Sequence, residues 1–539
     1  MHQSFDTLDW SVIIGYFILL LGIAFWVIKQ ENKNTEDYFL AGRSIGWFVV
    51  GASIFASNIG SEHVVGLAGA GAGGKIPMLI YELHAWLVLA LGWVFLPFYL
   101  RSGVFTMPEF LERRFNSKAR WFLTTFSLLA YIMTKVSVTI YAGGIVISSL
   151  FHIDFWFGAL LTVVLTGAYT ILGGMRAVVY TEAVQTILIV VGAGTLTYVG
   201  LNEAGGWSGV KANLPEGYLN MWRPNDDPDF PWLPLVITST IVGTWYWCTD
   251  QYIVQRALAA RNITQGRRGT IFGALLKLMP VFLFLIPGII ALSLKNSGQL
   301  QYDTADQAFA TLLMQKMPSG LRGLVGAGLL AALMSSLASV FNSCSTLFTV
   351  DVYQKLYPDA PQKKLLRVGR IATSIVVVLG IFWIPIMQNI SGTLYEYLQS
   401  VQSYIAPPIT AVFLLGIFFK RINSQGAMAT LIAGLGVAVV RLGLELGKNS
   451  LDPNGFLFAF GNMNFLSFAA WFFLFSIIVC VVASLLTPAP APEQIQGLTF
   501  STLSQEQKDA NRGSYSIGDI VVSLIILGIV AYVMFSFRG

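Results

Sequence analysis

Charged residues are scarce in this chain. They make up 11% of its 539 residues, whereas hydrophobic residues make up 55%. A soluble globular protein carries about 25% charged residues. The shortage therefore excludes a large soluble fold and favours a surface that faces lipid. The net charge of +5 does not indicate nucleic-acid binding, because the basic residues lie in short loops between apolar runs, as membrane topology requires.

Cysteine and histidine are scarce as well. Cys248, Cys344 and Cys480 fall inside apolar runs without metal-ligand spacing, so we expect small buried residues rather than disulfides or zinc ligands. The four histidines also lack such spacing. No lysine–serine pair follows the glycine-rich run 69–74, so it favours close helix packing over a phosphate loop. We therefore expect neither an enzyme nor a protein with a cofactor.

Long apolar runs recur along the whole chain. A membrane-spanning helix needs roughly 20 mostly apolar residues. The first run, 10–28, has no small-residue cleavage site after it and reads as a membrane helix rather than a signal peptide. The pattern predicts an all-α integral membrane protein, a single transmembrane domain over residues 1–539. It has fourteen candidate spans, at about 9–29, 46–74, 79–100, 121–150, 154–173, 177–201, 232–257, 269–294, 321–352, 366–388, 393–419, 424–445, 463–487 and 517–536.

The distribution of basic residues predicts the orientation of these spans. With residue 1 outside, 22 of the 33 Lys and Arg residues fall on inside loops and nine fall outside or at outer helix ends. This bias predicts an outside amino terminus in a multi-pass protein of the plasma membrane, or of a bacterial inner membrane. The inside segment 488–516 opens with three prolines and is expected to be a flexible cytoplasmic linker.

The second span carries a cluster of small and polar residues in its middle. Asn58 is followed within five positions by Glu62 and His63, which an unbroken helix facing lipid does not need. We expect the helix to break near residues 56–60, which frees carbonyl oxygens that could bind a cation in a cavity. The alternative is a seam of small residues for tight packing.

The ninth span presents hydroxyl groups at Ser335 and Ser336, with Ala332 one turn earlier. Sodium is a hard cation that favours oxygen ligands, and two neutral hydroxyls with three carbonyls would make a weak, reversible site. The alternative is that small residues simply let two helices approach closely.

Further polar residues lie at membrane depth. Lys277 lies nine residues past Arg268, which is roughly 13 Å along a helix. A lysine stem does not easily reach back that far, so we expect Lys277 to face a cavity or a carboxylate. Aromatic faces beside convergent polar groups suit a polyhydroxylated ligand. The polar and aromatic residues of this kind are Glu82, Lys135, Asp250, Gln399, Tyr246 and Trp247.

These motifs resemble the sodium–glucose cotransporter (SGLT) family of sodium/solute symporters. The resemblance runs from Thr35-Glu-Asp-Tyr-Phe-Leu-Ala-Gly-Arg43 to about residue 487. It is most specific at residues 51–69, 245–256, 331–351 and 397–408.

The resemblance implies the leucine-transporter fold, in which two inverted five-helix repeats would span 46–201 and 232–419, with extra helices at both ends. It implies that sodium is the co-substrate and binds the carbonyls of Ala56, Ile59 and Ala332 and the hydroxyls of Ser335 and Ser336. It implies a sugar site formed by Asn58, His63, Glu82, Tyr246, Trp247, Lys277 and Gln399. It also implies gates formed by Leu67, Tyr81, Tyr246 and Tyr395.

The chain departs from the family pattern at four positions. Glu182 replaces an aspartate beside a candidate second cation site that would also include Ser339. Ala338 replaces the hydroxyl residue of the two-sodium carriers, which favours one sodium per sugar. Glu62 stands where glycine is expected and Thr139 replaces an acid, which could alter the choice of substrate.

The leading hypothesis is a sodium-coupled symporter that imports a monosaccharide of the glucose or galactose type by alternating access. One alternative changes the cargo to myo-inositol, another polyol or a sugar acid. Another changes the class to a sugar-gated sensor or sodium leak without concentrative uptake.

Overall fold

The computed structural model describes the chain except residues 1–3, 31–33, 61, 152, 389–393, 448–449 and 539, and except the side chains of residues 142, 149, 383–388, 394–398, 400 and 446. Apart from one isolated bridge between Ile45 and Ala260, the regular structure of the described residues is helical. Eleven of these helices are long and apolar enough to cross a membrane, and one bent pair adds a twelfth span. The all-α membrane fold is confirmed.

The longer helices are α1 (Thr7–Ile28), α3 (Trp47–Asn58), α9 (Ser117–Tyr131), α10 (Ser137–Phe151), α11 (Phe155–Glu203), α13 (Trp232–Thr244), α15 (Ile263–Leu276), α16 (Ile286–Asn296), α18 (Leu321–Thr346), α20 (Gln362–Gln388), α21 (Leu394–Phe418), α22 (Ser424–Leu446), α24 (Phe465–Leu485) and α27 (Ile517–Ser536). The shorter α-helices are α2 (Thr35–Leu40), α4 (Ala68–Ala72), α5 (Leu79–Glu82), α6 (Ala85–Ala90), α7 (Leu96–Ser102), α8 (Met107–Arg114), α12 (Gly206–Ala212), α14 (Gln251–Leu258), α17 (Ala308–Lys316), α19 (Gln354–Leu356), α23 (Phe456–Gly461), α25 (Pro492–Ile495) and α26 (Gln505–Arg512).

Wider, π-helical turns interrupt several spans. They are η2 (Glu62–Leu67), η4 (Leu91–Phe95), η5 (Ile132–Val136), η6 (Trp245–Thr249), η7 (Val281–Leu285) and η9 (Leu347–Tyr353). Short 3-10 turns are η1 (Ala41–Arg43), η3 (Ile76–Met78), η8 (Ala305–Gln307) and η11 (Phe500–Thr502). Such π-helical turns are frequent at functional sites, and here η2, η5 and η6 carry polar or aromatic residues that the sequence singles out.

Helix α11 contains two of the fourteen expected spans. Its 49 residues would extend over about 73 Å as one helix, more than twice the thickness of a bilayer core. The helix is broken at Gly174, whose φ of 61° and ψ of −156° are open to glycine but not to other residues. The break falls between the expected spans 154–173 and 177–201, so the long element is two spans joined at a glycine.

Two further spans are broken where polar residues interrupt them. Helix α3 ends at Asn58, and the chain resumes in η2 and α4 after a bend of 63°. This confirms the expected break near residues 56–60. The expected span 232–257 is divided into α13, η6 and α14, with Asp250 in extended conformation between the last two. Both breaks face the interior of the bundle, where exposed backbone groups are tolerated in a membrane protein.

Glycine allows the central helices to approach closely. A Cβ atom added to Gly51 of α3 would lie 2.6 Å from the carbonyl oxygen of Gly269 in α15, so a larger residue would force the two helices apart. Helix α18 packs against α11 and is buried along its length. Together α3, α11, α15 and α18 form the core of the bundle.

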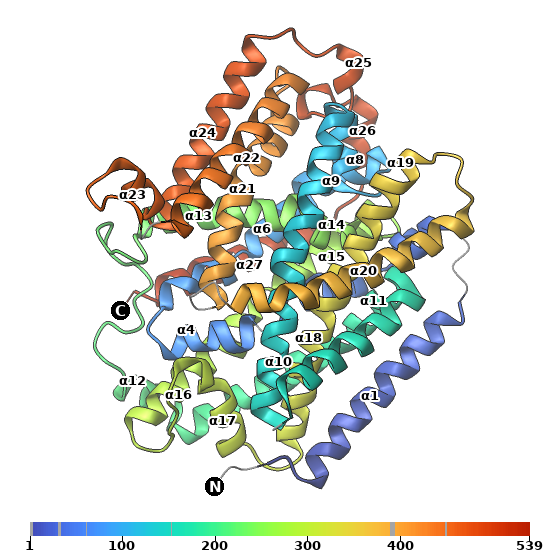
Figure 1. The fold of residues 1–539 in the computed structure, drawn as a ribbon. Helices are drawn as coiled ribbons and strands as arrows, with labels where there is room; N and C mark the ends of the chain where they lie inside the picture. Colours follow the sequence, from blue (N-terminus) through green and yellow to red (C-terminus); the bar gives the residue numbers. More distant parts are fainter. Residues whose placement is uncertain are drawn as a thin grey trace.

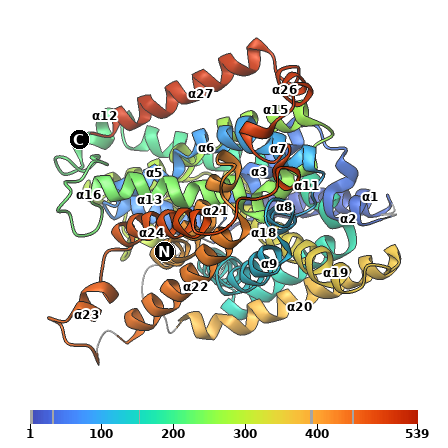
Figure 2. The ribbon, with the colours of Figure 1, turned by 90° about the horizontal axis from the view of Figure 1, so that it is seen from above.

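Peripheral helices surround this core. Figure 1 shows α1 along the edge of the bundle beside α11, and Figure 2 shows α27 along another edge, where it packs on α6 and α15. Large apolar side chains such as Ile18, Trp471 and Leu524 are exposed on α1, α24 and α27. Extended exposed apolar surfaces mark contact with another apolar phase, here the lipid.

The segment 488–516 contains α25, η11 and α26 and is tied to the bundle by hydrogen bonds. Gln494 donates to the Phe115 carbonyl at 2.7 Å, and Arg267 donates to the Asn511 side chain at 2.6 Å. Its flexibility stays a prediction. The three cysteines are buried and free, as expected.

Candidate functional site

A buried cavity lies where the two broken spans face each other. About 460 Å³ there is not filled by atoms, a volume that includes space open to solvent. All seven residues expected to bind sugar line it. The described residues that line it are Asn58, Glu62, His63, Tyr81, Glu82, His84, Lys135, Val242, Gly243, Tyr246, Trp247, Lys277, Gln399 and Gln402.

An ion pair crosses the cavity. The Lys277 ammonium lies 2.5 Å from Glu82 Oε2, and each side chain is only 3% exposed. The other carboxylate oxygen of Glu82 lies 3.5 Å from His63 Nε2, and that nitrogen lies 3.4 Å from Asn58 Nδ2. The expectation that Lys277 faces a cavity or a carboxylate is confirmed on both counts. The pair connects α5 with the end of α15, and the histidine connects it to the break in α3.

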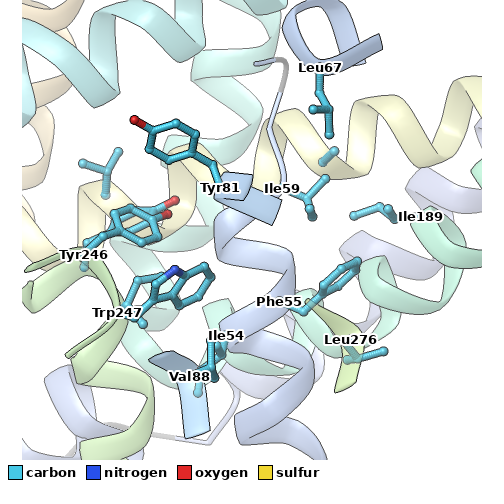
Figure 3. Packing of buried hydrophobic residues seen from close by; sticks show 14 of the residues in the cluster. Ile54, Phe55, Ile59, Leu67, Tyr81, Val88, Ile189, Tyr246, Trp247 and Leu276 are labelled. Atoms are coloured by element: carbon cyan, nitrogen blue, oxygen red, sulfur yellow. The ribbon is translucent and has the colours of Figure 1, made fainter. Parts of the chain in front are cut away.

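Aromatic rings form another wall of the cavity. The rings of Tyr246 and Trp247, both in η6, lie edge to face with centroids 4.9 Å apart. Figure 3 shows both rings, together with Tyr81, on the same side of α3. The Lys277 ammonium lies 5.3 Å from the Trp247 ring, and the Lys135 ammonium lies 4.1 Å from the Tyr246 ring. The aromatic faces therefore stabilise both cations, as cation–π contacts do.

Several polar atoms in the cavity are buried without a hydrogen-bond partner among the described residues. They are Glu62 Oε2, the Tyr81 hydroxyl, His84 Nε2 and Gln399 Oε1. Leaving a buried donor or acceptor unpaired costs about 1–3 kcal/mol. Four such atoms around one cavity fit a ligand that carries several hydroxyl groups.

His84 belongs to the site but was not predicted from the sequence. It lies in the irregular turn between α5 and α6, two positions after Glu82. In a helix, residues two apart point in different directions, whereas this turn brings both side chains to the same cavity. Only the local break of the helix could have indicated it.

The five residues expected to bind sodium converge beside the break in α3. Ser335 Oγ lies 2.8 Å from the Ala56 carbonyl oxygen and 2.9 Å from that of Ala332. Ser336 Oγ lies 2.7 Å from the Ile59 carbonyl oxygen. The α3 break supplies two of the five oxygen atoms and α18 supplies three, so the spacing expected from sequence is compatible with one small cation. Sodium binding by these residues stays a prediction.

The Glu182 carboxylate, part of the candidate second cation site, lies beside a fixed cation. Arg256 NH2 lies 3.6 Å from Glu182 Oε1, and both side chains are fully buried. Ser53 and Ser339 donate hydrogen bonds to the same carboxylate, and Ser57 does so at 3.3 Å. The chain itself thus supplies a positive charge at this position.

The expected gate residues are found in two environments. Tyr81 and Tyr246 line the cavity, whereas Leu67 is buried in the apolar core outside the lining. The side chain of Tyr395 lies outside the described part of the structure. The roles of these residues as gates stay predictions.

A helical bundle whose broken spans surround a buried polar cavity is the architecture of secondary transporters. The family model "Sodium:solute symporter family" matches residues 38–434. The chain therefore belongs to the sodium:solute symporter family. It is a sodium-coupled transporter rather than an enzyme, and sodium is its co-substrate.

Related proteins agree with this assignment and confirm the resemblance to the sodium–glucose cotransporters. The chain is 38% identical to sodium/glucose cotransporter 4 of Homo sapiens, over 95% of the chain and 81% of the relative. It is 39% identical to sodium/glucose cotransporter 1 of Oryctolagus cuniculus, over 90% and 80%. It is 38% identical to the sodium/myo-inositol cotransporter of Bos taurus, over 93% and 76%.

Solved structures confirm the leucine-transporter fold class. A Na⁺-coupled sialic acid symporter in an outward-open state superimposes with a TM-score of 0.77 at 21% identity, over 90% of this chain and 99% of that one. Mhp1, a nucleobase-cation-symport-1 family transporter, superimposes with a TM-score of 0.53 at 13% identity, over 90% and 100%.

Proposed function

We propose that the protein imports a monosaccharide of the glucose or galactose type together with sodium. The observation that carries the proposal is the cavity itself, where a charged pair, aromatic rings and unpartnered polar atoms converge. The apolar CH faces of a sugar ring pack on aromatic rings such as Trp247, and sugar hydroxyls pair with donors and acceptors. A purely apolar cargo would leave those polar atoms unpaired.

Myo-inositol, another polyol or a sugar acid is the alternative cargo. A cyclic polyol offers the same combination of CH faces and hydroxyls as a sugar. Relatives named for glucose and for myo-inositol are equally similar to this chain. Only a direct comparison of cargoes separates them.

Coupling between sodium and cargo follows from the break in α3. The carbonyl oxygens of Ala56 and Ile59 lie beside Ser335 and Ser336, whereas the intervening Asn58 reaches His63 in the cavity. A cation that fixes this short irregular stretch also fixes Asn58. Each ligand therefore raises the affinity for the other, because the coupling free energy is reciprocal. Sodium binds first from outside, the cargo follows, the outer gate closes, and both leave inside.

We infer that one sodium accompanies each cargo molecule. The Arg256 guanidinium lies beside the Glu182 carboxylate, and Ala338 supplies no hydroxyl at the position where the two-sodium carriers have one. A second mobile cation at Glu182 and Ser339 would have to lie against this guanidinium.

The amino terminus is proposed to lie outside, in the plasma membrane or a bacterial inner membrane. The basic loops support this orientation, since they face the cytoplasm in membrane proteins generally.

The proposal is tested with purified protein in liposomes. Uptake of labelled glucose, galactose and myo-inositol is measured with an inward sodium gradient and, as the control, with potassium in its place. We expect sodium-dependent accumulation above the external concentration, with the preferred cargo identified by competition. A sugar-gated sensor or leak would give current without accumulation, which would contradict symport. Gln399→Ala is expected to weaken uptake, and unchanged uptake by this variant would contradict the assigned sugar site.

A further inference from the structure

Glu62 places a carboxylate in the cavity, and one of its oxygen atoms bonds to none of the described residues. It is the first residue of η2, directly beyond the break in α3, and its side chain is 11% exposed. Its Oε2 atom is buried without a hydrogen-bond partner in the described part of the chain. The nearest cationic group to its other oxygen is His63 Nδ1, at 3.9 Å.

The two lysines of the cavity make their closest contacts with groups other than Glu62. Lys277 is paired with Glu82 at 2.5 Å. The Lys135 ammonium lies 4.1 Å from the Tyr246 ring and 4.6 Å from the Tyr252 ring, and the Glu62 carboxylate attracts it from beyond hydrogen-bond distance. Glu82 and Lys277 are thus paired with each other, whereas one oxygen of the Glu62 carboxylate has no hydrogen-bond partner among the described residues and is available to a ligand.

The charge of Glu62 also balances the cavity. The lining contains the carboxylates of Glu62 and Glu82 and the ammonium groups of Lys135 and Lys277. With neutral histidines, the formal charges cancel. Without Glu62 the cavity would carry a net positive charge, and Coulomb interactions at low dielectric would then favour an anionic ligand.

We propose that Glu62 determines cargo specificity: its free carboxylate oxygen accepts a hydroxyl of a neutral sugar or polyol, and its charge excludes sugar acids. The inference rests on the proposed function and narrows it to neutral cargo. Glu62 acts by two separable properties, its ability to accept a hydrogen bond and its negative charge.

Two substitutions separate these properties. Glu62→Gln keeps the shape and a hydrogen-bond acceptor but removes the charge. Glu62→Asp keeps the charge but withdraws the carboxylate by one methylene. Glu216→Gln, on an exposed loop residue, is the matched control for loss of a carboxylate.

The measurement is competition against uptake of the preferred neutral cargo in liposomes, with glucose and glucuronate as competitors. In the wild type we expect glucuronate to compete at least about tenfold more weakly than glucose, the ratio that 1.4 kcal/mol represents. Glu62→Gln should reduce this ratio about tenfold or more. Glu62→Asp should preserve the ratio but make glucose a weaker competitor than it is in the wild type. Glu216→Gln should behave as the wild type.

Several results would overturn the inference. They are wild-type preference for glucuronate, an unchanged competition ratio in Glu62→Gln, or loss of the ratio in Glu62→Asp. If Glu62→Gln folds but does not transport, ligand-induced thermal stabilisation in detergent gives the same ratio. If Glu62→Gln does not fold, Glu62→Asp provides the test. The inference then requires that Glu62→Asp binds glucose more weakly than the wild type and keeps the wild-type ratio of glucose to glucuronate competition. Absence of sodium-dependent uptake of every neutral cargo by the wild type would instead overturn the proposed function.

Discussion

Glu82 and Lys277 are opposite charges that lie 195 positions apart in the chain and 2.5 Å apart in the fold. Taking either charge out of water is costly, and the cost is offset only while both partners are present. The pair therefore fixes α5 against the end of α15, and its two charges cancel within the cavity.

Removing one member of this pair should destabilise the protein more than removing both. Glu82→Gln or Lys277→Gln leaves an uncompensated buried charge, which costs about 3–5 kcal/mol. We expect each single variant to melt at a lower temperature in detergent than the double variant. Glu203→Gln, which breaks the more exposed pair with Lys316, should change little. A double variant less stable than both single variants would contradict the argument.

Ser336 offers a second residue-level test. Ser336→Ala removes one of the five oxygen ligands proposed for sodium, so the sodium concentration for half-maximal uptake should rise at least about tenfold, equivalent to 1.4 kcal/mol. Ser345→Ala is the matched control, because Ser345 is buried in the same helix but bonds to the Gly369 carbonyl. Wild-type sodium affinity in Ser336→Ala would refute the assignment.

The sequence predicted which residues form the site better than it predicted their partners. Asn58, His63 and Lys277 were recognisable because polar groups are costly in lipid. The pairing of Lys277 with Glu82 was not, since no spacing rule relates residues so far apart. His84 and the guanidinium of Arg256 beside Glu182 were also missed, because burial and contact depend on how distant helices pack.

The spans themselves were predictable from hydropathy, but their internal irregularities were predictable only in part. The break in α3 was indicated by consecutive polar residues. The π-helical turns η5 and η6 were not, because one extra residue per turn barely changes an apolar pattern. Gly174 separates two spans within α11 because its backbone adopts a positive φ. The sequence alone does not show which glycines are needed for such a conformation and which only allow close helix packing.

Gly174→Ala should therefore weaken the fold at the level of this helix pair. An added Cβ would lie 2.6 Å from the Tyr38 carbonyl oxygen, and the required backbone conformation costs a non-glycine residue about 1–3 kcal/mol. We expect a lower melting temperature and a lower yield of folded protein. Gly167→Ala is the control in the same helix, because its Cβ would meet only Ile171, at 3.9 Å. Equal stability of the two variants would contradict the role assigned to Gly174.

The whole molecule has an orientation that labelling can test. The three native cysteines are buried and should give little background. A cysteine at exposed Ser208 should react with an impermeant maleimide applied to intact cells, whereas one at exposed Glu506 in α26 should react only after permeabilisation. The opposite pattern would reverse the proposed topology.

The buried contact between Arg256 and Glu182 bears on how steeply the protein can concentrate its cargo. A guanidinium fixed to the chain balances an acidic group without crossing the membrane, so it draws no energy from the voltage. A membrane potential of 100 mV supplies about 2.3 kcal/mol per translocated charge, which corresponds to roughly a fortyfold accumulation, and a second mobile sodium would square that factor. With its second positive charge tethered, the carrier would reach a lower ceiling of accumulation but would spend only one ion of the sodium gradient on each molecule it brings in.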